Sequence, residues 1–342
     1  MLEGIIGAMN APVPIDTELE GRFHGVFYGC AVGDALGTPF EGKPISPGTD
    51  EETLLRGFIE MPGWPKGQYT DDTMLTLALA RSIGEQGGVA GGHIIHEFAT
   101  LWRKGIIIGA GSATNDAIGN YIYQHKPWDQ CGAPIGDAGN GAAMRAAPIG
   151  LWYYDDLEAI IPAAIEASEV THRDPRSIAA AVAVALMTAY AVQADSLDPT
   201  DILHLIAGLL LQVDTGISDH VMRLADWIVE PEDEAIRRIV ATGQFGPWRG
   251  TWAGGITAYA VPTLLISFFC FLRHQDDFGK AVSRAILAGG DTDTSGAITG
   301  TLCGALRGSG AIPDHLREGV LNSKDIGAAA GRFYASRFGR TS

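Results

Sequence analysis

Basic side chains are scarce in this sequence of 342 residues. It holds 24 Lys and Arg against 40 Asp and Glu, which gives a formal net charge of −16 at pH 7. Proteins that bind nucleic acids hold the phosphate backbone with clustered Lys and Arg, and the sequence has no run of basic residues. General nucleic-acid binding is therefore excluded. An anionic ligand would need a local positive source, such as a metal ion or a helix N-terminus.

Cysteine is also scarce, and its four copies are dispersed. Cys30, Cys131, Cys270 and Cys303 form no CxxC pair, which excludes the usual spacing of a zinc site and gives no sign of a disulfide framework. A reducing, cytoplasmic setting is expected from this usage. The N-terminal segment also lacks the basic region and the long apolar stretch of a secretory signal. We therefore expect no export.

Long hydrophobic runs are limited to residues 253–272, which carry no charge. Twenty residues could cross a bilayer, but this run contains Gly254, Gly255 and Pro262 and stands alone. A buried core helix is the better interpretation, and the Ala- and Val-rich residues 178–192 indicate the same. Helices that are apolar all round belong in the middle of a large helical protein, so we expect no membrane association.

Helical periodicity dominates the rest of the chain, and alternating strand patterns are scarce. Residues 1–20 contain proline and acidic residues without periodicity and are expected to form an arm. Residues 21–342 show no fixed repeat and no linker, which favours a single all-α domain. The predicted helices span residues 19–36, 71–86, 92–104, 113–123, 157–168, 175–193, 199–211, 232–242, 257–273, 277–287 and 294–306.

Two acidic motifs stand at predicted helix starts. Thr70, Asp71 and Asp72 precede an apolar helical pattern, and capping alone would explain them, because acidic residues favour the N-terminal turn. The sequence Asp291-Thr292-Asp293-Thr294 follows two glycines and precedes a helix of unusually small residues. Such a helix is expected to pack closely against another backbone. Hard cations such as Mg²⁺ prefer the oxygen ligands that both motifs offer.

The two motifs together predict a site for two metal ions. Four carboxylates clustered without Lys or Arg would be electrostatically costly. Two divalent ions bridged by these carboxylates would remove that cost. Glu41, on a loop that Pro39 restricts, could be a metal-water ligand, a base or a surface acid. The Gly-rich segments 109–114 and 139–150 leave room for a ligand near the backbone, or are tight turns. His172 lies at a predicted turn, where capping is the alternative, and His93, His96 and Glu97 indicate a solvated helix face.

The motifs resemble those of the ADP-ribosylglycohydrolase family, which includes the dinitrogenase reductase-activating glycohydrolase and hydrolases of ADP-ribosylarginine and ADP-ribosylserine. The resemblance covers residues 21–306 and rests on GCAVGDALGTPFEG, YTDDTMLTLAL, GNGAAMRAAPIG, ASEVTH and LAGGDTDTSGAITG, in this order. It implies a compact orthogonal helical bundle in one domain. It also implies a binuclear Mg²⁺ or Mn²⁺ centre and hydrolysis of the bond between ADP-ribose and a modified side chain.

The resemblance assigns roles to particular residues. Glu41, Asp71 and Asp72 would be catalytic. The metal ligands would be Thr70, Asp71, Asp72, Asp291, Asp293 and Thr294. The ADP-ribose groove would be lined by Gly109, Gly111, Ser112, Thr114, Gly139, Asn140, Gly141, Met144 and His172.

The acceptor of ADP-ribose is open at this stage, with arginine slightly favoured. Arginine-directed relatives tend to carry an acidic residue ahead of the GxG segment, whereas residues 105–108 read Gly-Ile-Ile-Ile. Asp116 could compensate if its helix faces the groove. Alternatives are hydrolysis of serine-linked or O-acetyl-linked ADP-ribose, immunity against an ADP-ribosylating toxin with the N-terminal arm contacting the partner, and binding of ADP-ribose without turnover. The partner is then an ADP-ribosylated protein or a small molecule containing ADP-ribose.

Overall fold

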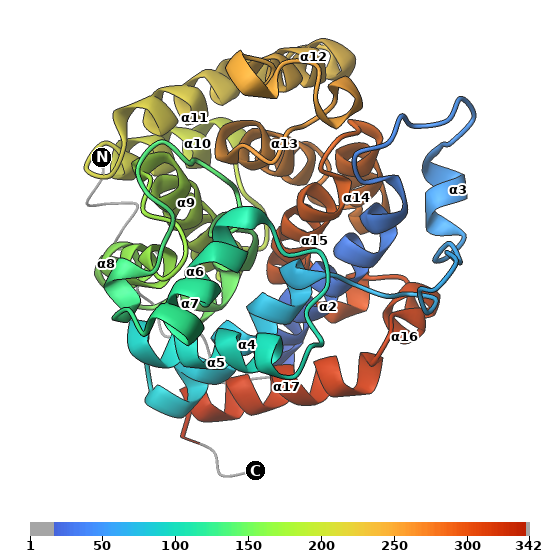
Figure 1. The fold of residues 1–342 in the computed structure, drawn as a ribbon. Coiled ribbons are helices and arrows are strands. Elements are labelled where there is room, and N and C mark those ends of the chain that lie inside the picture. Colours follow the sequence, from blue (N-terminus) through green and yellow to red (C-terminus); the bar gives the residue numbers. More distant parts are fainter. Residues whose placement is uncertain (1–16, 340–342) are drawn as a thin grey trace.

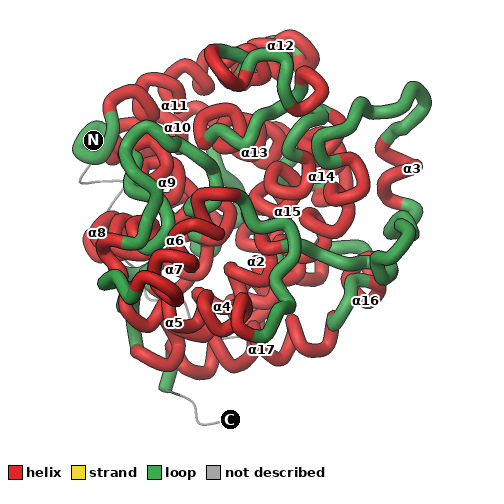
Figure 2. The backbone as a smooth tube through the Cα atoms, viewed as in Figure 1, coloured by secondary structure: helices red, strands yellow, loops and turns green. Residues whose placement is uncertain are grey.

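The computed structural model describes residues 17–339, and helices account for the regular structure of this part, which contains no β-strand (Figure 2). The predicted all-α class is confirmed. The α-helices are α2 (Thr17–Gly37), α3 (Glu51–Leu55), α4 (Asp71–Gln86), α5 (Gly91–Arg103), α6 (Ser112–Gln124), α7 (Ala147–Trp152), α8 (Leu157–Glu169), α9 (Pro175–Ala191), α10 (Pro199–Leu210), α11 (Thr215–Trp227), α12 (Glu232–Gly243), α13 (Ala260–Arg273), α14 (Phe278–Leu287), α15 (Thr292–Arg307), α16 (Asp314–Gly319) and α17 (Ser323–Arg337).

The centre of the molecule is the pair α2 and α15, which lie side by side although they stand at opposite ends of the sequence (Figure 1). Glycines recur every fourth residue along the contact face of α2, from Gly25 to Gly37, and three more, from Gly296 to Gly304, line α15. A Cβ added at Gly29 would lie 2.0 Å from the carbonyl oxygen of Gly300. The predicted close approach by another backbone is confirmed, and α2 is the partner.

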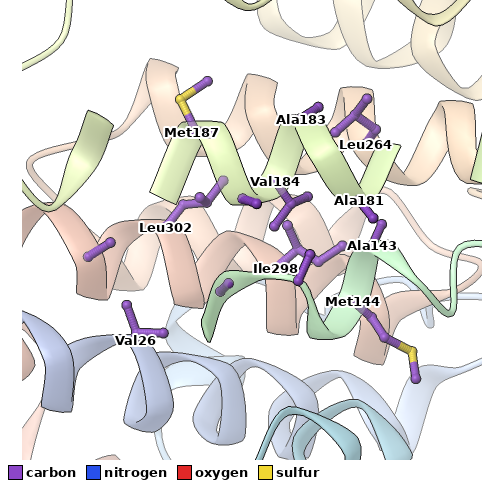
Figure 3. Close-up of a cluster of buried hydrophobic side chains, with 14 of the residues drawn as sticks. Val26, Ala143, Met144, Ala181, Ala183, Val184, Met187, Leu264, Ile298 and Leu302 are labelled. Carbon is purple, nitrogen blue, oxygen red and sulfur yellow. The ribbon is translucent and has the colours of Figure 1, made fainter. Parts of the chain in front are cut away.

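Apolar helices surround this pair. In α13 the residues from Ala260 to Leu272 are all buried, as are those of α9 from Ser177 to Ala191. Figure 3 shows Val184 of α9 beside Ile298 and Leu302 of α15 in one apolar cluster. The expected core helices are confirmed, and no helix in residues 17–339 has the length and hydrophobicity needed to cross a bilayer.

Some helix boundaries differ from the prediction. The helix expected over residues 257–273 begins at Ala260, because the residues before it pair with distant loops: Tyr259 bridges to Gly139, and Ile256 bridges to Gly290. Helices α11 and α17 were not predicted, although each buries residues at helical spacing, such as Ile217, Val221 and Leu224 in α11. Of the predicted arm, residues 1–16 lie outside the described residues, and residues 17–20 form the first turn of α2.

Candidate active site

A cavity of about 300 Å³ opens where the loops before α4, α6 and α15 meet. With the exception of Thr70, the structure brings every predicted site residue to its wall. Those residues are Glu41, Asp71, Asp72, Gly109, Gly111, Ser112, Thr114, Gly139, Asn140, Gly141, Met144, His172, Asp291, Asp293 and Thr294. Segments more than 200 residues apart in sequence thus share one pocket.

Asp34 lies behind the cavity wall and organises the acidic cluster. It is fully buried in α2, and its carboxylate accepts hydrogen bonds from the backbone N–H groups of Thr70 and Thr73, at 3.0 and 3.1 Å, and from both hydroxyls. The hydroxyl of Thr38 adds a fifth donor. Sequence reasoning gave Asp34 no role, because the partners of a residue inside a helix are visible only in the fold.

The hydroxyl of Thr70 does not cap α4, which corrects the capping interpretation. Thr70 occupies the N-cap position, but its side chain makes no cap hydrogen bond. It donates to Asp34 and faces Oδ2 of Asp72 at 3.3 Å. Asp71 and Asp72 follow in the first turn, both buried, and Thr294 of α15 approaches the same Oδ2 of Asp72 at 3.4 Å. Oδ2 of Asp72 therefore connects the two acidic motifs, and Thr70 lies beside it.

The second acidic motif is held by loops on three sides. Asn140 donates to Oδ2 of Asp291 at 2.6 Å, and the backbone N–H of Asp291 donates to the carbonyl of Ile256. Carboxylate oxygens of Glu41, Asp291 and Asp293 lie within 4.8 Å of one another, close enough to share one ion. Glu41 reaches this position because its loop is tied down by a hydrogen bond from Gly42 to the carbonyl of Gly290, at 2.8 Å.

The electrostatics of the cluster favour a bound cation. Burial, followed by repulsion from Asp34, raises the pKa of Asp71 to about 8. Burial and then Asp291 raise the pKa of Glu41 to about 7, and burial drives the pKa of Asp72 and of Asp293 well above the usual range. Oδ1 of Asp72 is buried without a hydrogen-bond partner among the described residues. Such an oxygen is available to bind a cation, and a set of carboxylate oxygens could hold a divalent metal ion.

Glycines and an imidazole form the opposite wall. Gly109 has φ +88°, and a Cβ there would lie 3.0 Å from Oδ1 of Asp71. A Cβ at Gly139 or at Gly141 would lie 3.3 Å from Nε2 of His172. The side chain of His172 is buried, and burial lowers its pKa to about 3, with the charge of Arg145 as the second cause. A neutral imidazole edge therefore faces a space that only glycines leave open.

Three polar or aromatic residues of the cavity wall escaped sequence reasoning. Trp248 and Trp252 come from the loop between α12 and α13, and Asp137 comes from the loop before the GNG segment. Trp252 and the next residue, Ala253, both have positive φ, at +54° and +51°, a strained conformation that is typical of functional loops. The signal in the sequence that could have indicated this loop was the presence of two tryptophans between glycines. Asp116 is exposed on α6 and does not line the cavity, so it does not supply the acidic group considered for arginine.

Two other features have ordinary explanations. Glu85, His93 and Glu97 lie close together near the surface, but Arg81 forms an ion pair with Glu97, which fits a solvated helix face. A second hollow of about 350 Å³ includes Arg22, whose guanidinium donates to backbone carbonyls of the α9 C-terminus and pairs with carboxylates. Neither feature gathers buried groups that lack partners.

Comparisons with known proteins agree on one family. The family model for ADP-ribosylglycohydrolase matches residues 16–342. The ADP-ribosyl-(dinitrogen reductase) glycohydrolase of Rhodospirillum rubrum is 29% identical and the alignment covers 85% of this chain and 87% of that protein. The ADP-ribosylhydrolase ARH3 of Xenopus tropicalis is 27% identical over 94% of this chain and 97% of its own. A solved structure described as an ADP-ribosylglycohydrolase-related protein complex superposes with a TM-score of 0.69, at 28% identity, and covers 94% of this chain and 100% of that one.

Proposed function

Because this chain belongs to the ADP-ribosylglycohydrolase family, we propose that it is an enzyme that hydrolyses the glycosidic bond between ADP-ribose and a modified side chain. The observation that carries this proposal is the cavity itself. Two acidic motifs and Glu41 meet at one side of it, and glycine-rich loops form the other. A cluster of carboxylates beside a groove open to a nucleotide suits hydrolysis at an anomeric carbon.

The acidic cluster fits two divalent cations. Thr70, Asp71, Asp72, Asp291, Asp293 and Thr294 would hold Mg²⁺ or Mn²⁺, and the fit rests on the partnerless Oδ1 of Asp72 and on the raised pKa values of the buried carboxyls. Bound there, such ions supply Lewis acidity toward ribose oxygens and a water of lowered pKa.

The carboxylates of the chain itself handle the water and the proton. Glu41 lines the cavity beside the acidic cluster, where its carboxylate can accept a proton from the attacking water. Asp72 and Asp71 are the other two candidates for orienting the water. The water oxygen forms a bond to the anomeric carbon, the bond to the acceptor side chain breaks, and the acceptor leaves with the proton that the base took from the water.

The glycine-rich wall would take the rest of ADP-ribose. Gly111 and Ser112 stand at the start of α6, where free backbone N–H groups suit a pyrophosphate. Met144, Thr114 and His172 line the same wall. Trp248 and Trp252 offer aromatic faces on which an adenine can stack. An acidic protein could thereby bind an anionic ligand without a basic patch.

We propose arginine as the acceptor. A guanidinium leaving group needs a carboxylate outside the metal cluster, and Asp137 is the acidic side chain that the cavity wall offers there. Serine-linked ADP-ribose needs no such partner, so the two acceptors can be told apart. Asp137→Asn should slow release from an arginine peptide and leave release from a serine peptide unchanged.

Release of ADP-ribose from matched peptides carrying ADP-ribosyl-arginine or ADP-ribosyl-serine tests the proposal, with Mg²⁺, with Mn²⁺ and after chelation. We expect metal-dependent release that Asp71→Asn reduces at least about 100-fold, as expected for loss of a metal ligand. Asp116→Asn, an exposed aspartate outside the cavity, is the matched control and should match the wild type. Tight binding of ADP-ribose without release from either peptide would contradict hydrolysis and favour a binding protein.

A further inference from the structure

Arg145 is a buried cation that the proposed chemistry does not use. Its side chain is 1% exposed. The hydrogen bonds of its guanidinium among the described residues go to two backbone carbonyls and one hydroxyl, not to a carboxylate, and the guanidinium lies 5.1 Å from the ring centre of Phe98. It donates to the carbonyl of Gly141, on the cavity wall, and to Oγ1 of Thr171 at 2.6 Å. Burial lowers the pKa of Arg145 to about 9, which leaves it charged at neutral pH. A group this costly to bury needs a reason.

The hydrogen bonds of Thr171 give that reason. Thr171 is fully buried, and its hydroxyl has two partners, Nη2 of Arg145 and Nδ1 of His172, the latter at 2.8 Å. Arginine can only donate, so one lone pair of the hydroxyl is occupied. If Nδ1 of His172 carried the proton, it would take the second lone pair, and the hydroxyl hydrogen would have no acceptor. A buried donor without an acceptor is unfavourable, so the hydroxyl donates to Nδ1.

We infer that Arg145 and Thr171 are positioning residues that fix the tautomer of His172, so that its Nε2–H points into the cavity as a hydrogen-bond donor. His172 is neutral, as the lowered pKa of its imidazole requires, and one nitrogen must therefore carry the only proton. Nε2 has no partner among the described residues and lies between the two glycines of the GNG segment. The ligand atom that meets it must be a hydrogen-bond acceptor.

The same guanidinium holds both sides of this contact. Arg145 fixes Gly141 through its carbonyl and His172 through Thr171, so the spacing between the glycine and the imidazole depends on one side chain. In the proposed function, Nε2–H of His172 donates to an acceptor atom of ADP-ribose. This assignment rests on the proposed function for the identity of the ligand. The tautomer itself depends only on the contacts of the three residues.

The tautomer is measured directly by long-range ¹H–¹⁵N correlation spectra of the full-length, Mg²⁺-loaded protein labelled at histidine. His172→Gln identifies the signals of His172 among those of the nine histidines. We expect a protonated Nε2 and an acceptor Nδ1 in the wild type. Thr171→Val should abolish this preference and weaken ADP-ribose binding about tenfold, the loss of one buried hydrogen-bond network. Thr171→Ser keeps the hydroxyl and should keep both properties.

A wild-type protein with the proton on Nδ1 would overturn the inference, and this measurement needs no variant to fold. An unchanged tautomer in Thr171→Val would overturn it as well. A protein with the expected tautomer that bound no ADP-ribose would establish that Arg145 and Thr171 fix the tautomer of His172, and it would contradict the proposed function. The spectrum tests the tautomer separately from the binding of ADP-ribose. A purely structural role of Thr171 would leave the tautomer of His172 unchanged in Thr171→Val.

Discussion

At the residue scale, the groups that shape the acidic cluster include one that never touches the cavity. Five donors converge on the buried carboxylate of Asp34, and two of them are backbone N–H groups at the start of α4. A charged acceptor satisfies these donors as a helix cap would, but from a neighbouring helix. The direction of Asp71 and Asp72 therefore depends on Asp34, since it holds the turn on which they stand.

Asp34→Asn should destabilise the protein by about 2–4 kcal/mol, because the amide nitrogen would face N–H donors and leave at least one of them unpaired. Urea unfolding measures the loss, and metal-dependent release of ADP-ribose should fall with it. Asp50→Asn is the matched control. Asp50 is exposed and caps α3 by accepting from the backbone and hydroxyl of Thr53, and Asn caps a helix nearly as well as Asp. Equal unfolding of the two variants would contradict the role given to Asp34.

His172 gives a prediction about pH. Burial, with Arg145, holds its pKa at about 3 in the folded protein, whereas an unfolded histidine has a pKa of about 6.5. Below pH 6.5 the unfolded chain binds a proton that the folded protein does not, so stability falls as the pH falls. Between pH 7 and pH 5 this residue should lower the free energy of unfolding by about 2 kcal/mol.

The comparison that isolates this effect is the wild type against His172→Gln, with urea unfolding at both pH values. Other titrating groups contribute to both proteins and cancel in the difference. The variant should lose about 2 kcal/mol less than the wild type on acidification. The same pH dependence in both proteins would show that His172 is not held neutral.

At the scale of elements, the pair α2 and α15 brings the two acidic motifs together, because Asp34 of α2 holds the start of α4, where the first motif stands. The glycines of α2 and α15 meet backbone to backbone, and Thr292 donates to the carbonyl of Gly37 at 2.8 Å. Asp34 lies on α2, and Asp293 lies in the first turn of α15. The distance between these two helices therefore sets the distance between the carboxylates of Asp34 and Asp293.

Gly29→Ala should destabilise the protein by about 3 kcal/mol or more, because the new methyl group would overlap the backbone of Gly300 and a helix would have to move. Gly208→Ala on α10 is the matched control: nothing lies within 4 Å of a Cβ there, so alanine should stabilise the helix by up to about 1 kcal/mol. Thermal or urea unfolding gives both values. A destabilisation of similar size in both variants would contradict the role of the close contact.

The helices differ in how well the sequence predicted them, for physical reasons. The expected range of α4 agrees with the structure because its start and its apolar period are local signals. The predicted start of α13 was wrong because Ile256 and Tyr259 pair with loops far along the chain. In α17 the buried Ile326, Ala330 and Phe333 keep a helical spacing that small and polar neighbours conceal. Local patterns thus predict elements, while long-range pairing decides where some of them begin.

At the scale of the whole molecule, the meeting of the two acidic motifs at one cavity could be predicted because these motifs are short and chemically distinctive. The motifs that contain Asp71 and Asp293 offer carboxylate oxygens wherever the fold places them. The tryptophans of the α12–α13 loop gave only their place between glycines as a signal, and the hydrogen bonds that run from Arg145 through Thr171 to His172 gave none. Their position relative to the cavity exists only once helices from every part of the chain have packed.

The acidic cluster predicts that metal binding stabilises the whole fold. Without an ion, burial and then mutual repulsion disfavour the charged forms of carboxyls from both ends of the sequence, as their raised pKa values show. Mg²⁺ or Mn²⁺ at about 100 times its Kd should raise the free energy of unfolding by about 2.7 kcal/mol. The measurement is the Tm of the chelated protein during titration with each ion.

Asp71→Asn makes the sign of this effect testable. Asp71 accepts no hydrogen bond from another side chain among the described residues, so the amide removes an ionisable group and changes little else. The chelated variant should be more stable than the chelated wild type, because burial, followed by repulsion from Asp34, disfavours the charged form of the Asp71 carboxyl and the amide does not ionise. The variant should nevertheless gain less from added metal, because one ligand is gone. A chelated variant less stable than the wild type, or an equal gain from metal in both proteins, would show that the buried carboxyls of this cluster do not govern the stability of the fold.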